Sequence, residues 1–172
     1  MKKLAFLVLT VLCFSVVTVA SDDDVTVLTA SLRGADEVPA INSNGSATFR
    51  AVIHEDGTIT FTETFKNLTS DAIFSHIHFG EVHVAGGVMI FLCGGIKPAC
   101  PAAASGSFSG TIAPSDVVGP TTQGVTPGDL ASALRAIRQG AAYVNLHSMK
   151  FPGGEIRGQV IVHHGDEEGG DK

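Results

Sequence analysis

The strongest constraint in this 172-residue chain is a pair of alternating segments on either side of a tight turn. Apolar residues recur at every second position from 46 to 54, and a similar pattern follows from 58 to 65. Alternation with a period of two places one face of a strand against a core and the other in solvent. Asp56 and Gly57 lie between the segments, and Gly57 tolerates the positive φ of a tight turn. The sequence therefore predicts a β-hairpin with one apolar face.

Further short strands are expected at 25–32, 72–79, 88–93, 105–112, 142–147 and 156–163. One helix is expected between the strands at 105–112 and 142–147, because Thr126 offers an N-cap, Pro127 a first helical residue and Gly140 a stop. About seven short strands with frequent turns predict an all-β protein. We expect an immunoglobulin-like or Greek-key β-sandwich or barrel with one short helix in a connection.

The first twenty residues have the layout of a cleavable secretory signal. Lys2 and Lys3 precede an uncharged, mostly apolar run over 4–19, and Ala20 is followed by polar residues that begin at Ser21. A membrane anchor is the alternative, but a membrane span needs about 20 apolar residues. Cleavage of the signal is therefore the favoured interpretation.

Removal of residues 1–20 would leave one domain over 21–162 and an acidic, disordered tail over 163–172. The formal charge of −6 would become −8, because two lysines are lost. Such an acidic chain lacks the basic stripe of nucleic-acid binders, so no nucleic-acid partner is expected. No later stretch predicts a membrane span. We therefore expect a secreted, extracellular protein, periplasmic or on the cell surface if the host is bacterial.

Two cysteines remain in the expected mature chain, Cys93 and Cys100. An even number of cysteines in an oxidising compartment favours a disulfide between them. A metal-binding pair is the alternative, but its cysteines are usually separated by two to four residues rather than six. Asn44 and Asn67 begin Asn-x-Ser/Thr sequences, and each is a glycosylation acceptor if the host glycosylates exported chains.

Three histidines form a candidate metal site. His76 and His78 are two residues apart on an expected strand, so their rings share a face. His147 lies on another expected strand and would join them if the two strands are neighbours. Three neutral imidazoles suit copper or zinc, and Asn145 and Glu81 are candidate partners that would fix ring tautomers. The alternative is a set of ordinary, half-buried histidines on a β face.

The sequence shows no nucleophile elbow, no phosphate-binding glycine loop and no free thiol in the expected mature chain. Asp36 and Glu37 form an acidic pair close to Pro39, which we interpret as part of a rigid turn. Glu155 and Arg157 are interpreted as a pair on the last hairpin, worth about 0–1 kcal/mol if exposed. A binding or structural module is therefore favoured over an enzyme.

Several separated motifs resemble those of the CHRD domain, a family named for chordin, an extracellular antagonist of bone morphogenetic proteins. They lie at 28–40, 76–80, 143–148 and 151–158, in the order of the family, and the resemblance covers residues 26–162. It implies an extracellular, immunoglobulin-like β-sandwich or barrel of largely unassigned activity. The motifs are built around His76, His78 and His147, which gives these residues more weight. Chordin's cysteine-rich repeats are missing here, so growth-factor antagonism is not expected.

A weaker likeness to copper–zinc superoxide dismutase is limited to the His-x-His pattern and the fold class, and the zinc loop of that enzyme is not recognisable.

Two functional hypotheses result from these observations. The first is a secreted, non-enzymatic binding or structural module with a His-lined metal site and an extracellular protein or glycan as partner. The alternative is a copper- or zinc-dependent enzyme, or a metal carrier, that uses His76, His78 and His147.

Overall fold

The computed structural model of the chain describes residues 26–164. The predicted secretory signal and nearly all of the predicted tail lie outside this range. The described residues form nine strands: β1 (Thr26–Arg33), β2 (Ser46–Ile53), β3 (Ile59–Lys66), β4 (Ala72–Phe79), β5 (Gly87–Cys93), β6 (Gly106–Ile112), β7 (Ala142–Ser148), β8 (Ile156–Gln159) and β9 (Ile161–His163).

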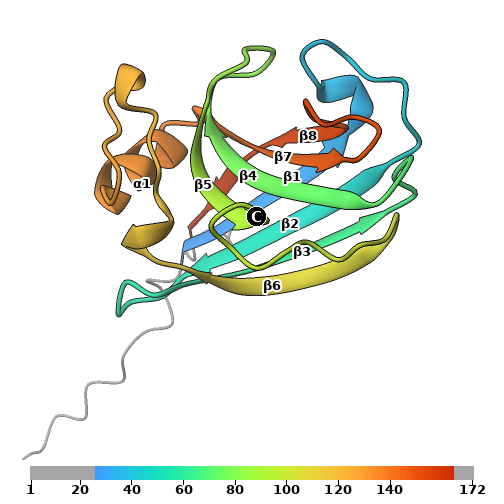
Figure 1. Ribbon diagram of the computed structural model, residues 1–172. Helices are drawn as coiled ribbons and strands as arrows, with labels where there is room; N and C mark the ends of the chain where they lie inside the picture. Colours follow the sequence, from blue (N-terminus) through green and yellow to red (C-terminus); the bar gives the residue numbers. More distant parts are fainter. Residues whose placement is uncertain (1–25, 165–172) are drawn as a thin grey trace, which may run out of the picture.

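All strand pairs are antiparallel and belong to one sheet with the order β5-β4-β7-β8-β1-β2-β3-β6, with β9 beside β1. The sheet curves into a nearly closed barrel, as Figure 1 shows. The prediction of an all-β fold is confirmed. The strand order also brings β4 next to β7, although about 70 residues separate them in the chain.

The core fills the inside of the barrel with the alternate residues that the sequence pattern indicated. On β2 and β3, Phe49, Phe61 and Phe65 point inward and are almost fully buried. The rings of Phe49 and Phe61 lie 6.2 Å apart and are stacked. Glu63 occupies the same inward phase, and its side chain is fully buried in this apolar interior.

The single α-helix of residues 26–164, α1 (Leu130–Arg138), begins three residues later than the first helical residue predicted from the sequence. Asp129, not Thr126, is the N-cap, because its carboxylate accepts a hydrogen bond from the backbone N–H of Ser132 at 2.9 Å. Gly140 follows the helix with φ of 75°, which agrees with its predicted role as a stop. Ala133, Ala136 and Ile137 face the core, and α1 (orange) lies to one side of the barrel in Figure 1.

The last predicted strand is divided at Val160 into β8 and β9. β9 pairs with β1, and His163 lies opposite Val27. The ring of His163 is 2.9 Å from the Thr29 hydroxyl. The strand β9 therefore includes His163, the first residue of the predicted tail.

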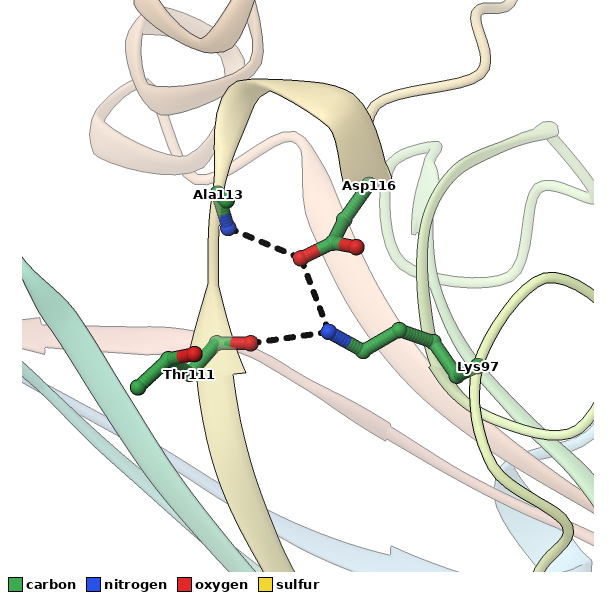
Figure 2. A network of polar contacts seen from close by, with 4 residues as sticks. All are labelled: Lys97, Thr111, Ala113 and Asp116. Carbon is green, nitrogen blue, oxygen red and sulfur yellow. Dashed lines mark hydrogen bonds and ion pairs between the residues drawn. The ribbon is translucent and has the colours of Figure 1, made fainter.

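The two edge strands of the sheet, β5 and β6, approach each other without pairing, which leaves the barrel nearly closed. The predicted disulfide between Cys93 and Cys100 is confirmed, and it closes the segment that follows β5 into a short loop. Figure 2 shows how this loop is tied to the end of β6 by Lys97. The Lys97 ammonium donates to the Asp116 carboxylate at 2.8 Å and to the Thr111 carbonyl at 2.9 Å. The same carboxylate oxygen of Asp116 accepts from the backbone N–H of Ala113 at 2.8 Å.

We expect Asp116→Ala to lower the free energy of unfolding by about 2 kcal/mol, because it leaves the Lys97 ammonium and the Ala113 N–H without their acceptor. The side chains of Lys97 and Asp116 are only 16% and 11% exposed, so water replaces the lost partner poorly. Urea denaturation measures the change. Asp36→Ala is the matched control, because it removes the more exposed pair with Arg33 and should cost less than about 1 kcal/mol. Equal losses in the free energy of unfolding of the two variants would contradict the proposed role of the Lys97–Asp116 ion pair.

Candidate metal centre

The three candidate histidines lie on the outer face of the barrel, on the neighbouring strands β4 and β7. His76 lies opposite Asn145 in the strand register, which puts His147 one diagonal step away. Ile77 and Leu146 alternate with these residues and are fully buried on the inner face. Their burial fixes the phase of each strand, because a one-residue slip would turn the apolar side chains out of the core.

The imidazole rings converge. One ligand nitrogen from each of His76, His78 and His147 can be chosen so that all three lie within 4.8 Å of one another. The Nδ1 atom of His76 is 3.2 Å from Nε2 of His147. The His76 ring centroid lies 5.5 Å from that of His78 and 4.9 Å from that of His147. The structure therefore brings together the three histidines that the sequence singled out.

Two backbone carbonyls orient the rings. Nδ1 of His78 lies 3.0 Å from the carbonyl oxygen of Gly86, and Nδ1 of His147 lies 2.9 Å from that of Pro152. A carbonyl can only accept, so each Nδ1 carries the proton and each Nε2 presents a lone pair. The lone pair of His147 lies within hydrogen-bond distance of Nδ1 of His76, at 3.2 Å. The Nε2 atoms of His76 and His78 are buried and have no hydrogen-bond partner within residues 26–164.

Burial keeps the imidazoles neutral. It lowers the pKa of His76 to about 3, assisted by the charges of His147 and His78. It lowers the pKa of His78 to about 4, against the raising effect of the hydrogen bond to Gly86. The pKa of His147 is also lowered by burial, against the effect of the Pro152 carbonyl. At neutral pH the three rings therefore do not repel one another as cations.

Aromatic side chains surround the histidines. Phe74 stacks on His76 at 5.8 Å between ring centroids, and Phe91 of β5 meets the same ring edge-on at 4.4 Å. Tyr143 stacks on His78 at 4.7 Å with an angle of 8° between the ring planes. Phe74 is the most open of these, with 36% of its surface exposed. Aromatic rings therefore cover the imidazoles on several sides, and the ring of Phe74 is itself partly exposed.

The two polar side chains predicted to orient the rings have other positions. Asn145 donates its amide to the carboxylate of Glu37, not to an imidazole. The Glu81 side chain is exposed, and only its backbone carbonyl is used, as an acceptor for Arg157 at 2.8 Å. Backbone carbonyls of neighbouring loops bond to His78 and His147 instead.

Glu37 was interpreted from the sequence as part of a turn, but it lies buried beside this site. Burial raises its pKa to about 7, although the Val38 N–H, the Arg157 charge and the Asn145 amide oppose the rise. The adjacent Gly154 leaves room for this contact, since a Cβ there would lie 2.7 Å from a Glu37 oxygen and 2.5 Å from the Asn145 nitrogen. The local sequence pattern does not predict the interactions of Glu37 with Asn145 and Arg157.

The predicted pair of Glu155 and Arg157 does not form an ion pair among the described residues. Both side chains are buried, and they point to different partners. Arg157 lies over the ring of Tyr143 at 3.4 Å, so Arg157, Tyr143 and His78 form one continuous stack. Glu155 accepts hydrogen bonds from Ser43 and Thr69.

Two further predictions concerned glycosylation sites and membrane spans. Asn44 and Asn67, the predicted glycosylation acceptors, are both exposed, and glycosylation of either stays a prediction. Within the described range no helix is long and apolar enough to cross a membrane.

Comparison with known proteins gives one match. The family model described as the CHRD domain matches residues 28–160, which is most of the chain. That range includes all three histidines, both cysteines and Arg157. No curated protein matches the sequence, and no solved structure matches it.

Proposed function

The chain belongs to the CHRD domain family, and on that footing we propose that it is a secreted, non-enzymatic binding module that holds a transition-metal ion at His76, His78 and His147. Copper and zinc are the ions whose preferences suit three neutral imidazoles. Export is supported by the polar-flanked apolar run at 4–19 and by the disulfide, because disulfides persist in oxidising compartments.

The observation that carries the proposal is the pair of buried, unpartnered Nε2 atoms on His76 and His78. A buried nitrogen lone pair without a partner costs about 1–3 kcal/mol relative to one that is satisfied. Here the opposite nitrogen of His78 is already engaged with Gly86. The same arrangement, with an outer acceptor that fixes the ring and a free inner nitrogen, is typical of histidines that ligate metals.

The nitrogens would have to move closer together to hold an ion. Zinc–nitrogen bonds of about 2.0–2.1 Å in tetrahedral geometry place two ligand nitrogens about 3.4 Å apart. The three ligand nitrogens lie within 4.8 Å of one another, so binding would draw the widest pair together by up to about 1.4 Å. Three protein ligands leave a fourth tetrahedral position for water or another ligand.

We expect the purified protein to bind one Zn²⁺ or Cu²⁺ ion in calorimetric titration, and His76→Ala, His78→Ala and His147→Ala each to weaken binding by at least about 100-fold. Removal of a direct ligand should cost more than the 10–100-fold loss seen when an outer partner is removed.

His54→Ala is the matched control, because His54 lies near the β2–β3 turn and bonds to Thr60 away from the cluster. Its affinity should equal that of the unchanged protein. Binding that survives all three cluster substitutions, or that is lost in His54→Ala, would refute the site. Circular dichroism of each variant would establish that a loss of binding is not a loss of fold.

A further inference from the structure

A second polar site lies on the outer face of the barrel, on the far side of Tyr143 from His78. It is a pocket of about 270 Å³ between β1, β8 and the loop that follows β4. Ser31, Arg157 and Gln159 line it with polar groups. Val82 and Ile161 supply apolar rim, and both are more than half exposed.

Arg157 is the unusual group in this pocket. Its side chain is 2% exposed, yet no carboxylate lies within 4 Å of its guanidinium in the described part of the chain. Stacking on Tyr143 and one hydrogen bond to the Glu81 carbonyl are its only contacts of these kinds there. A guanidinium has five N–H donors, so both charge and donors remain for a ligand. A buried charge is normally paired, because an unpaired one is costly.

The neighbouring cation in the pocket behaves differently. Arg33 is 69% exposed at its side chain and is already paired with Asp36 at 3.0 Å. Asp36 therefore offsets Arg33, not Arg157. Glu37 is the acid whose pKa the Arg157 charge lowers, but burial outweighs that effect and leaves Glu37 partly protonated at neutral pH. Of the two arginines that line the pocket, Arg157 is therefore the one without a carboxylate partner among the described residues.

We propose that this pocket binds a small hydroxylated carboxylate, of which a single uronic acid is the type. The planar fork of an arginine matches a carboxylate with two parallel hydrogen bonds. The Ser31 hydroxyl adds a group that both donates and accepts. Gln159 uses its amide nitrogen on the Gly80 and Gly140 carbonyls, which holds the side chain in place and leaves its oxygen as an acceptor for a ligand hydroxyl. The proposal goes beyond the metal site and does not depend on it.

The test is an NMR titration of the ¹⁵N-labelled, metal-free protein with glucuronate at constant ionic strength, followed at the backbone amides of Ser31, His83 and Gln159. We expect saturable shifts with glucuronate, weaker ones with acetate, and none with glucose, which has the hydroxyls but no charge. Equal responses to glucose and glucuronate would overturn the proposal. Sulfate or phosphate binding as tightly as glucuronate would overturn the assignment to a carboxylate.

Two variants locate the response. Ser31→Tyr fills the pocket from an exposed position on β1 and should abolish the glucuronate shifts. Thr62→Tyr, an equal change at an exposed position on β3, should leave them unchanged. Arg157→Lys keeps the charge but loses the fork, and it should weaken binding by about tenfold. Retention of full affinity in Ser31→Tyr would refute the pocket as the site, whether or not the Arg157 variant folds.

Discussion

Glu63→Gln is expected to gain stability relative to the unchanged protein as the pH rises. Between pH 6.5 and pH 8, the difference in the free energy of unfolding between the two proteins should shift by about 2 kcal/mol in favour of the variant. Glu63 is fully buried inside the barrel, where Ser75 donates one hydrogen bond to it at 2.7 Å. Its second oxygen has no partner among the described residues. Burial raises the pKa of this carboxyl to about 8, against the effect of the Ser75 hydrogen bond.

The direction of the pH effect follows from the two protonation states. The ordinary pKa of 4.5 applies to Glu63 in the unfolded chain. Between that pH and about 8 the folded protein holds one more proton on Glu63 than the unfolded chain does. The free energy of unfolding therefore falls by about 1.4 kcal/mol per pH unit in this window. Glutamine has nearly the same shape and does not ionise, so the variant lacks this slope.

Urea denaturation of both proteins at several pH values from 6.5 to 8 measures the difference. The lower limit matters because His76 and His78, whose pKa values are lowered, make stability rise with pH below about 6.5. Glu55→Gln, in the exposed β2–β3 turn, is the matched control and should follow the unchanged protein. Parallel stability curves for Glu63→Gln and the unchanged protein would show that Glu63 does not titrate as described.

Glu155→Ala is expected to lower the free energy of unfolding by about 3–5 kcal/mol, which is a large part of the stability of a domain of this size. One carboxylate oxygen of Glu155 accepts from the Ser43 hydroxyl at 2.5 Å and from the N–H and hydroxyl of Thr69, both at 2.8 Å. These donors belong to the β1–β2 and β3–β4 connections. The carboxylate thus holds two loops against the start of β8, and alanine would leave their donors without an acceptor.

The pKa of Glu155 is consistent with a carboxylate that is held in its charged form. Burial tends to raise it, but hydrogen bonds from the Ser148, Ser43 and Thr69 side chains together lower it. Stability from this group is therefore present above the ordinary pKa and is lost as the pH falls through the lowered value. The pH dependence of stability that Glu155 contributes is therefore opposite in sign to that of Glu63.

Urea denaturation at pH 7 measures the Glu155 effect, with Glu81→Ala as a control at an exposed acidic position. The control should change stability by less than about 0.5 kcal/mol. Ser43→Ala and Thr69→Ala should each reproduce part of the loss, since each removes one donor. A loss below about 1 kcal/mol in Glu155→Ala would mean that water satisfies the loops equally well.

The class of the fold and the inward face of the strands could be predicted from the pattern of residues along the chain. Alternation around Asp56 and Gly57 predicted the β2–β3 hairpin, because the period of a strand is a property of its own backbone. The same periodicity put His76 and His78 on one face of β4. The disulfide between Cys93 and Cys100 was predictable because only two cysteines remain beyond residue 20.

Some information was present in the pattern but needed the structure to be understood. Glu63 lies in phase with Phe61 and Phe65, so its inward position was implied by alternation. Its protonation depends on how completely the other strands enclose it, which no local pattern states. The start of α1 was also ambiguous in the sequence, since Thr126 and Asp129 are both good N-cap residues, and the structure shows that Asp129 caps the helix.

The contacts between groups that are distant in the sequence could not be predicted from local patterns. The neighbouring positions of β4 and β7 join His76 to His147, and they result from the order of strands in the barrel. Arg157 stacks on Tyr143 rather than pairing with Glu155, because the two residues, although close in sequence, contact different loops and strands. Periodicity is local and can be read along the chain. Strand order and burial are long-range, and they set the charge state and partner of every polar group at both proposed sites.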